Sequence, residues 1–114
     1  MKRYLAETYV NVMKDLQKDI HQTATEKGWW AEPRDDGTIL MLIVTEIAEA
    51  CEGLRMGNNP DDKIPDYKNC EAELADVIIR ILDFADERGH DVIGALMAKM
   101  KYNKTRKYRH GKKF

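Results

Sequence analysis

The sequence has few residues that cross-link or interrupt a chain, with two cysteines, three prolines and seven glycines among its 114 residues. Cys51 and Cys70 form neither a CxxC pair nor a zinc-ligand set, so two reduced thiols are favoured over a disulfide. No uncharged apolar run approaches the roughly 18 residues of a membrane span, and the N-terminus lacks the apolar segment of a signal peptide. We therefore expect a cytoplasmic protein with no membrane partner.

What remains is a chain of long segments with helical periodicity. Apolar residues make up 43% and charged residues 34% of the chain, a balance typical of folded globular domains. The spacing of apolar residues predicts helices over Tyr4 to about Lys27, Thr38–Met56, Glu71–Arg88 and from Asp91 onward, with Asp91 as the N-cap. We expect an all-α fold, a four-helix, bundle-like single domain over residues 1–114. Because two of the four helices carry acids, the core is thin, and we expect the domain to assemble into an oligomer.

Two of the predicted helices carry paired acids in apolar surroundings. Glu46 and Glu49 follow an apolar run, and Glu73 and Asp76 repeat the same spacing on the next helix. Residues i and i+3 share a helix face, so an antiparallel packing of the two helices would bring all four carboxylates together. The stripe around the first pair predicts an amphipathic or mostly buried helix; its members are Ile39, Leu40, Leu42, Ile43, Ile47, Ala50 and Leu54.

Four carboxylates in one pocket need a counter-charge, because two carboxylates about 5 Å apart repel by roughly 3 kcal/mol at an effective dielectric near 20. Divalent cations supply it, and all-oxygen ligation suits Mg²⁺ or Mn²⁺ better than zinc. A ferritin-like di-iron site is disfavoured because it needs Glu-x-x-His pairs, which His21, His90 and His110 do not provide. The remaining acids near the two pairs are expected to be ordinary surface residues: Glu71, Asp83, Asp86, Glu87 and Glu52. Glu52 is ambiguous, because it extends the progression of Glu46 and Glu49 by one more turn.

The net charge of −1 conceals a basic C-terminal segment. Residues 99–114 hold eight Lys or Arg and no acid, whereas residues 1–98 hold 11 bases and 20 acids and so carry −9. Lys99, Asn103, Arg106 and His110 recur at helical spacing, which predicts one polar, mostly cationic face. An acidic body with a basic end suits an anion held by metal on one side and cations on the other, or a nucleic-acid arm. The helix before this face is expected to pack through Val92, Ile93, Leu96, Met97 and Met100.

The connection between the first two predicted helices carries Trp29, Trp30 and Arg34. At least one tryptophan is expected in the core or at a subunit contact, and the other could stack on a base. Arg34 is either a phosphate ligand or a solvated loop charge, and the sequence leaves both readings open. His21, taken alone, reads as a surface or half-buried residue.

Taken together, these residues resemble the MazG-like family of all-α nucleoside triphosphate pyrophosphohydrolases. That family is marked by ExxE, a spacer, ExxD, and then a Lys, an Asn and a basic residue on the last helix. The corresponding residues are Glu46-Ile-Ala-Glu49, Glu73-Leu-Ala-Asp76, and then Lys99, Asn103 and Arg106. The similarity covers about residues 21–114, and the ending from Tyr108 resembles the tails of short, single-domain members.

The resemblance implies hydrolysis of a nucleoside triphosphate, often a deoxynucleotide, to the monophosphate and pyrophosphate. It implies that Glu46, Glu49, Glu73 and Asp76 bind Mg²⁺, and that Lys99, Asn103 and Arg106 hold phosphates. His21 and Trp29 or Trp30 fall where relatives that cleave dCTP have base-pocket residues. The resemblance also implies a homodimer or homotetramer with pockets near the subunit boundary.

The predicted chemistry suits these residue types. A bound metal lowers the pKa of a water ligand and orients it for in-line attack on the α-phosphorus. Glu46 or Glu49 could accept the proton, and the face with Lys99 and Arg106 would stabilise the leaving pyrophosphate.

Two functions of other classes remain as alternatives. A small helical nucleic-acid-binding module would use the basic C-terminal tail. It leaves the acid pairs unexplained, and a nucleic-acid partner is disfavoured because the acidic body would repel phosphate backbones. A purely structural interaction domain would show no response to metal.

Overall fold

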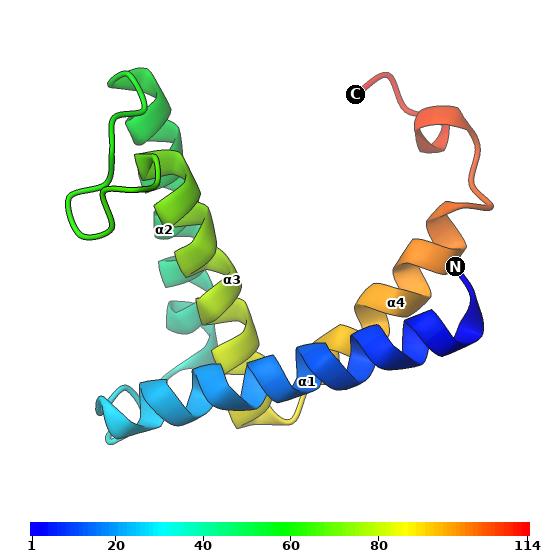
Figure 1. Cartoon of the computed structure of the whole chain (residues 1–114), viewed down its shortest axis with the longest axis horizontal. Helices are drawn as coiled ribbons and strands as arrows, with labels where there is room; N and C mark the ends of the chain where they lie inside the picture. The colour runs from blue at the N-terminus through cyan, green and yellow to red at the C-terminus, as the bar shows by residue number, and fades with distance from the viewer.

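The computed structural model describes residues 1–114 except for the side chain of Tyr4. The elements are α1 (Arg3–Glu26), α2 (Asp36–Arg55), α3 (Asn69–Arg88), α4 (Val92–Asn103) and a short 3₁₀ turn, η1 (Tyr108–Gly111). The described backbone contains no strand, only an isolated bridge between Pro60 and Lys68. The prediction of an all-α domain with four helices is therefore confirmed (Figure 1). Among the described helices, none has both the length and the apolar character needed to cross a membrane.

Local capping chemistry sets the helix ends close to their predicted positions. Asp35 caps α2 by accepting a hydrogen bond of 2.9 Å from the Thr38 backbone N–H, so the helix begins two residues earlier than expected. Asp91 caps α4 in the same way and accepts from the Gly94 N–H at 2.9 Å. Gly89 ends α3 with a φ of 68°, a left-handed conformation that glycine adopts without a steric penalty.

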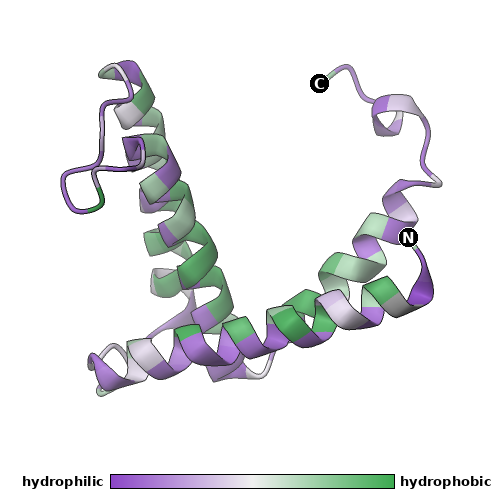
Figure 2. Cartoon of the chain, in the orientation of Figure 1, coloured by the Kyte–Doolittle hydropathy of each residue, from purple (hydrophilic) through white to green (hydrophobic). Residues whose placement is uncertain are grey.

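Helices α2 and α3 form an antiparallel pair, and α1 packs across the end of α3 (Figure 1). The pair is apolar along most of its length (Figure 2). Small and branched residues at the contact let the two helices approach closely. The buried apolar residues are Ile39, Ile43 and Ala50 of α2, Ala72, Leu82 and Ala85 of α3, and Ile93 of α4.

Helix α4 leaves this group and packs mainly on α1, so the four helices do not close into a bundle within one protomer. Figure 1 shows α2 and α3 on one side, α4 and the C-terminal segment on the other, and α1 joining them below. The radius of gyration is 16.6 Å, whereas a compact domain of this length has about 13 Å. A single protomer is therefore open, with two arms.

Many apolar residues that were expected to be buried are exposed instead. On α2 the exposed members of the predicted stripe are Leu40, Ile47 and Leu54, and on α4 they are Leu96 and Met100. Helix α2 packs mainly on α3, and α4 packs mainly on α1. One neighbouring helix covers only part of the apolar face of each, so the rest of the predicted stripe stays exposed within one protomer. Contiguous exposed apolar surface of this kind marks protein contacts.

The predicted cationic helical face is wrong beyond Asn103, where α4 ends. Arg106 follows in a bend and His110 lies in η1 with a φ of 55°. The apolar pattern stops at Met100, and a helix without a packed face gains little stability. The cations after Met100 also repel one another at helical spacing. Lys99 and Arg106 nevertheless both lie against the Tyr102 ring, at 5.8 and 5.5 Å from its centroid.

Candidate metal centre

Helices α2 and α3 bring the predicted acids to one place. Glu46, Glu49 and Glu73 each offer a carboxylate oxygen, and these three atoms lie within 4.8 Å of one another. Asp76, one turn further along α3, lines the same cavity. The i, i+3 spacing accounts for this, since it keeps both acids of each helix on the face where the antiparallel partner packs.

Burial makes the acid cluster costly without a cation. Glu46 is only 8% exposed, and Oε2 of Glu46 and Oε2 of Glu73 are buried without a hydrogen-bond partner among the described atoms. Burial, followed by the proximity of Glu46 and Glu49, raises the pKa of Glu73 to about 7. The pKa of Asp76 is also raised, first by burial and then by the charge of Glu46. Hard oxygen donors with free, buried lone pairs fit a divalent cation such as Mg²⁺ or Mn²⁺.

Arg80 orients the most buried of these acids. Its Nε and one terminal nitrogen both lie 3.0 Å from Oε1 of Glu46, which leaves Oε2 free to face the cluster. Partners of this kind fix the rotamer of a ligand and keep it charged. Sequence reasoning missed Arg80, although a cation four residues after Asp76 in an otherwise apolar stretch was a usable signal.

The acids form one side of a cavity of about 340 Å³. Three cations, Arg34, Lys63 and Arg80, and the ring of Trp29 also line it. Lys63 comes from the loop between α2 and α3, where Asp61 accepts hydrogen bonds of 3.0 Å from the backbone N–H groups of Lys63 and Ile64. These bonds hold the pKa of Asp61 below its ordinary value and fix the turn that carries Lys63. The cavity therefore combines carboxylate oxygens with cations, a lining suited to a polyanion that carries a metal ion.

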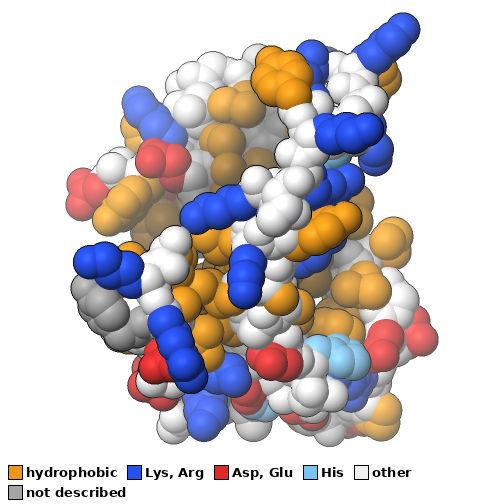
Figure 3. All heavy atoms as spheres, turned by 90° about the vertical axis from the view of Figure 1, so that its right-hand side faces the viewer, with side chains coloured by type: hydrophobic (Ala, Val, Ile, Leu, Met, Phe, Trp, Pro, Cys, Tyr) orange, Lys and Arg blue, Asp and Glu red, His pale blue; other side chains and the backbone are white. Residues whose placement is uncertain are grey.

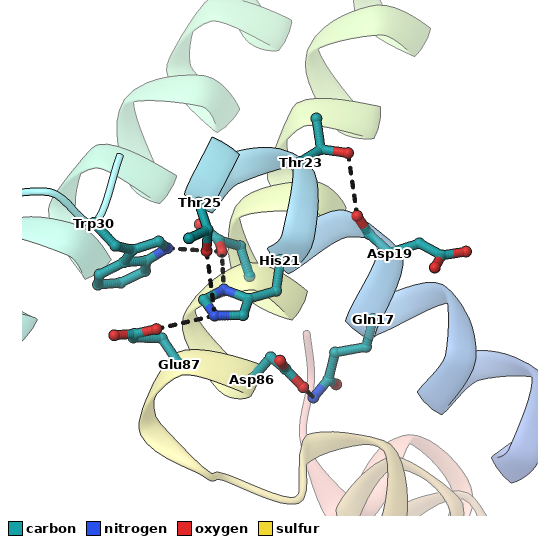
Figure 4. A network of polar contacts seen from close by, with 9 residues as sticks. Gln17, Asp19, His21, Thr23, Thr25, Trp30, Asp86 and Glu87 are labelled. Carbon is teal, nitrogen blue, oxygen red and sulfur yellow. Dashed lines mark hydrogen bonds and ion pairs between the residues drawn. The ribbon is translucent and has the colours of Figure 1, made fainter. Parts of the chain in front are cut away.

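His21 and Trp30 do not line this cavity, but both contact Asp83, which does. Nδ1 of His21 is 2.7 Å from Oδ1 of Asp83, its Nε2 is 3.0 Å from Oε2 of Glu87, and the Trp30 indole N–H donates to the same Asp83 oxygen at 2.9 Å (Figure 4). Asp83 is 8% exposed, so its assignment as a surface acid is wrong. The sequence could not show this, because its partners come from α1 and the α1–α2 connection. Of the residues predicted for a base pocket, Trp29 alone is among those that line the described cavity.

The predicted phosphate ligands lie on the other arm of the protomer. Lys99, Asn103 and Arg106 are not among the described residues that line the cavity. They belong to α4 and the segment after it, which pack mainly on α1. Within one protomer the acids and these three residues do not meet.

Comparisons of the chain with protein-family models, curated proteins and solved structures found no match. The chemical assignment therefore depends on the geometry of the cluster. Three carboxylates whose oxygens lie within 4.8 Å of one another, with a fourth acid and three cations on the same cavity, can bind a divalent ion and the oxygens of a phosphate chain. Surface acids at helical spacing do not have buried, unpartnered oxygens of this kind.

The raised pKa of Glu73 predicts a pH-dependent stability of the metal-free protein. Folded Glu73 keeps its proton up to about pH 7, whereas its ordinary pKa is 4.5. Between those values the folded state binds more protons than the unfolded state, so the free energy of unfolding falls as the pH rises. We expect the melting temperature in EDTA to fall by several degrees between pH 5 and pH 8.

A comparison with the Glu73→Gln variant isolates the effect of Glu73 on the pH dependence of the melting temperature. The variant should show a flatter dependence on pH and a higher melting temperature at pH 8. Saturating Mg²⁺ should restore the stability of the native protein at pH 8 and do less for the variant. The exposed Glu52→Gln serves as the control. Parallel profiles for the native protein and Glu73→Gln would contradict the assignment.

Proposed function

We propose that the protein hydrolyses a nucleoside triphosphate to the monophosphate and pyrophosphate, and that its substrate is a deoxynucleoside triphosphate. Mg²⁺ or Mn²⁺ would be held by Glu46, Glu49, Glu73 and Asp76. The observation that carries the proposal is the convergence of three carboxylates from α2 and α3 within 4.8 Å. The cations on the same cavity suit a substrate that is itself a metal-binding polyphosphate.

The roles of the acids follow from their surroundings. When bound, the metal ion would lower the pKa of a water ligand and orient it for in-line attack on the α-phosphorus. Glu46 is held by Arg80 and buried, so it suits a fixed ligand. Glu49 is exposed and has no such restraint among the described contacts, so it is the better candidate to accept the proton from the attacking water.

The phosphate-binding roles of Lys99, Asn103 and Arg106 require a second copy of the chain. Within one protomer these residues lie on the arm away from the acids. A second copy that covers the exposed apolar residues of α2 could bring its own α4 to the acid cluster. The basic segment 99–114 and the acidic remainder of the chain are complementary in charge. We therefore propose a homodimer or homotetramer in which each cavity is completed by the partner.

This assembly predicts a dimer or tetramer by size-exclusion chromatography with light scattering. The physical reason is the free energy gained by covering large exposed side chains, roughly 25 cal/mol per Å² of apolar surface. Exposed examples on α2 are Met41 at 60% and Val44 at 50%. The double variant Met41→Lys and Val44→Lys should shift the species toward a folded monomer. A monomeric native protein at micromolar concentration would contradict both the assembly and the shared cavity.

A second candidate function is nucleic-acid binding through the C-terminal segment. Figure 3, which looks onto α4 and this segment, shows Lys and Arg side chains spread along the face with hydrophobic side chains between them. Tyr102 and Tyr108 are 56% and 90% exposed there and could stack on bases. This function gives no role to the acid cluster.

One experiment separates the two functions. The protein is incubated with mixed dNTPs and Mg²⁺, and the products are analysed for monophosphate and pyrophosphate. Cleavage that EDTA abolishes supports the pyrophosphohydrolase. A salt-sensitive shift of labelled DNA without nucleotide cleavage supports the binding module. Rates over the four dNTPs and four NTPs would then define the substrate.

A further inference from the structure

Arg34 lines the cavity, and its guanidinium lies over two aromatic rings. Its guanidinium carbon lies 4.9 Å from the centroid of Trp30 and 5.8 Å from that of Trp29. The residue is half-buried and lies in the connection between α1 and α2. Its backbone oxygen accepts a hydrogen bond of 2.8 Å from Arg88, which fixes the chain at this point. The backbone is therefore anchored at Arg34, and the two rings restrict where its guanidinium can lie.

Among the described residues, no carboxylate forms an ion pair with Arg34. Two other arginines, Arg80 and Arg88, lie over the same tryptophan rings. Both have carboxylate partners: Arg80 bonds to Glu46, and Arg88 bonds to Asp36 at 2.8 Å. Lys63, the third cation of the cavity, has no ion pair among the described residues, although its charge favours the ionised forms of the nearby Asp61 and Asp76. Arg34 has no ion pair among the described residues, and its recorded side-chain contacts are the two rings. Its charge is therefore available to a ligand, and it is the cation of the cavity wall that also lies over both tryptophan rings.

We propose that Arg34 binds a phosphate group of the nucleotide, in the same cavity as the carboxylates that would bind the metal. A guanidinium that stacks on an indole ring uses its flat face for the contact, so the N–H groups at its edge stay free to donate to two oxygens of one phosphate. Stacking also removes the entropy cost of ordering a long side chain when the ligand arrives. The assignment rests on the proposed function, and it adds an anion ligand from the same protomer as the acids.

The test measures phosphate binding separately from cleavage. Inorganic tripolyphosphate is titrated in Mg²⁺ against the native protein, Arg34→Met, Arg34→Lys and Arg55→Met, by calorimetry. Tryptophan fluorescence gives a second readout, since the two tryptophans of the chain both flank Arg34. Arg55→Met is the charge-matched control, because Arg55 is exposed at the end of α2 and pairs with Glu52.

We expect Arg34→Met to weaken tripolyphosphate binding by about ten- to a hundredfold. Arg34→Lys should show a smaller loss, because it keeps the charge without the planar fork. Mn²⁺ binding and the melting temperature should stay unchanged in both variants. In nucleotide cleavage, Arg34→Met should raise KM more than it lowers kcat. Arg55→Met should behave as the native protein does throughout.

The failures of the two proposals are distinguishable. If Arg34→Met binds tripolyphosphate as tightly as the native protein, or cleaves nucleotide with an unchanged KM, the role of Arg34 is wrong while the cleavage reaction stands. If the native protein binds tripolyphosphate through Arg34 but cleaves none of the eight nucleotides, the proposed reaction is wrong while the anion site stands.

Discussion

The Glu49→Gln variant is expected to lose metal-dependent nucleotide cleavage by about a hundred- to ten-thousandfold, the range that general-base groups contribute. Glutamine keeps the shape of the side chain but removes the charge that binds the metal and the site that accepts the proton. Glu49 is exposed on α2, so the substitution should leave the helix content and melting temperature intact. Steady-state cleavage rates, circular dichroism and Mn²⁺ titration together check this expectation.

Two further variants make the result interpretable. Asp76→Asn should abolish cleavage in the same way, because it removes an acid of the same cavity from α3. Glu52→Gln lies one turn beyond Glu49, is exposed, and should keep full activity. If Glu49→Gln or Asp76→Asn unfolds the protein rather than removing metal-dependent activity, the acids have a structural role instead.

The second large effect is expected from mixed oligomers. Arg106→Gln and Glu49→Gln should each be inactive alone, because one removes a phosphate ligand and the other an acid. If each cavity takes its acids from one copy and Arg106 from another, a mixed dimer has one intact cavity. Subunit exchange at equal amounts should then recover about a quarter of the native activity, since half of the dimers are mixed and each has one working site.

The matched control for that recovery is a mixture of Glu49→Gln with Asp76→Asn. Both of these variants damage the acid side, so every mixed cavity carries a defect and no activity should return. Absence of recovery in the Glu49→Gln and Arg106→Gln mixture, with both variants folded and exchanging subunits, would mean that Arg106 does not act across the interface. Cross-linking of tagged copies would show that exchange has occurred.

Local sequence signals predicted much of the fold. The capping role of Asp91, the four helices and the positions of the paired acids all follow from spacing within a few residues. The roles of Asp83, Arg80 and Lys63 were missed because each depends on a partner from another element. Asp83 meets His21 and Trp30 across more than fifty residues of chain. A charged residue in an apolar stretch signals that a partner exists, but single-sequence spacing does not identify it.

The direction of α4 was the other feature that spacing could not supply. Its apolar residues predicted that one face of the helix is packed. They did not indicate whether that face packs on α1, on α3 or on another copy of the chain. The helix packs on α1, and Leu96 and Met100 remain exposed. The expectation of a bundle treated those residues as core because their periodicity is that of core residues.

The open arrangement of α4 has a practical consequence at the bench. If the catalytic cavity is completed by a second copy, the rate per milligram of protein should decline on dilution, as association gives way to dissociation. Assays at nanomolar protein would then record a weak enzyme, whereas assays at higher protein concentration would record the associated, working form.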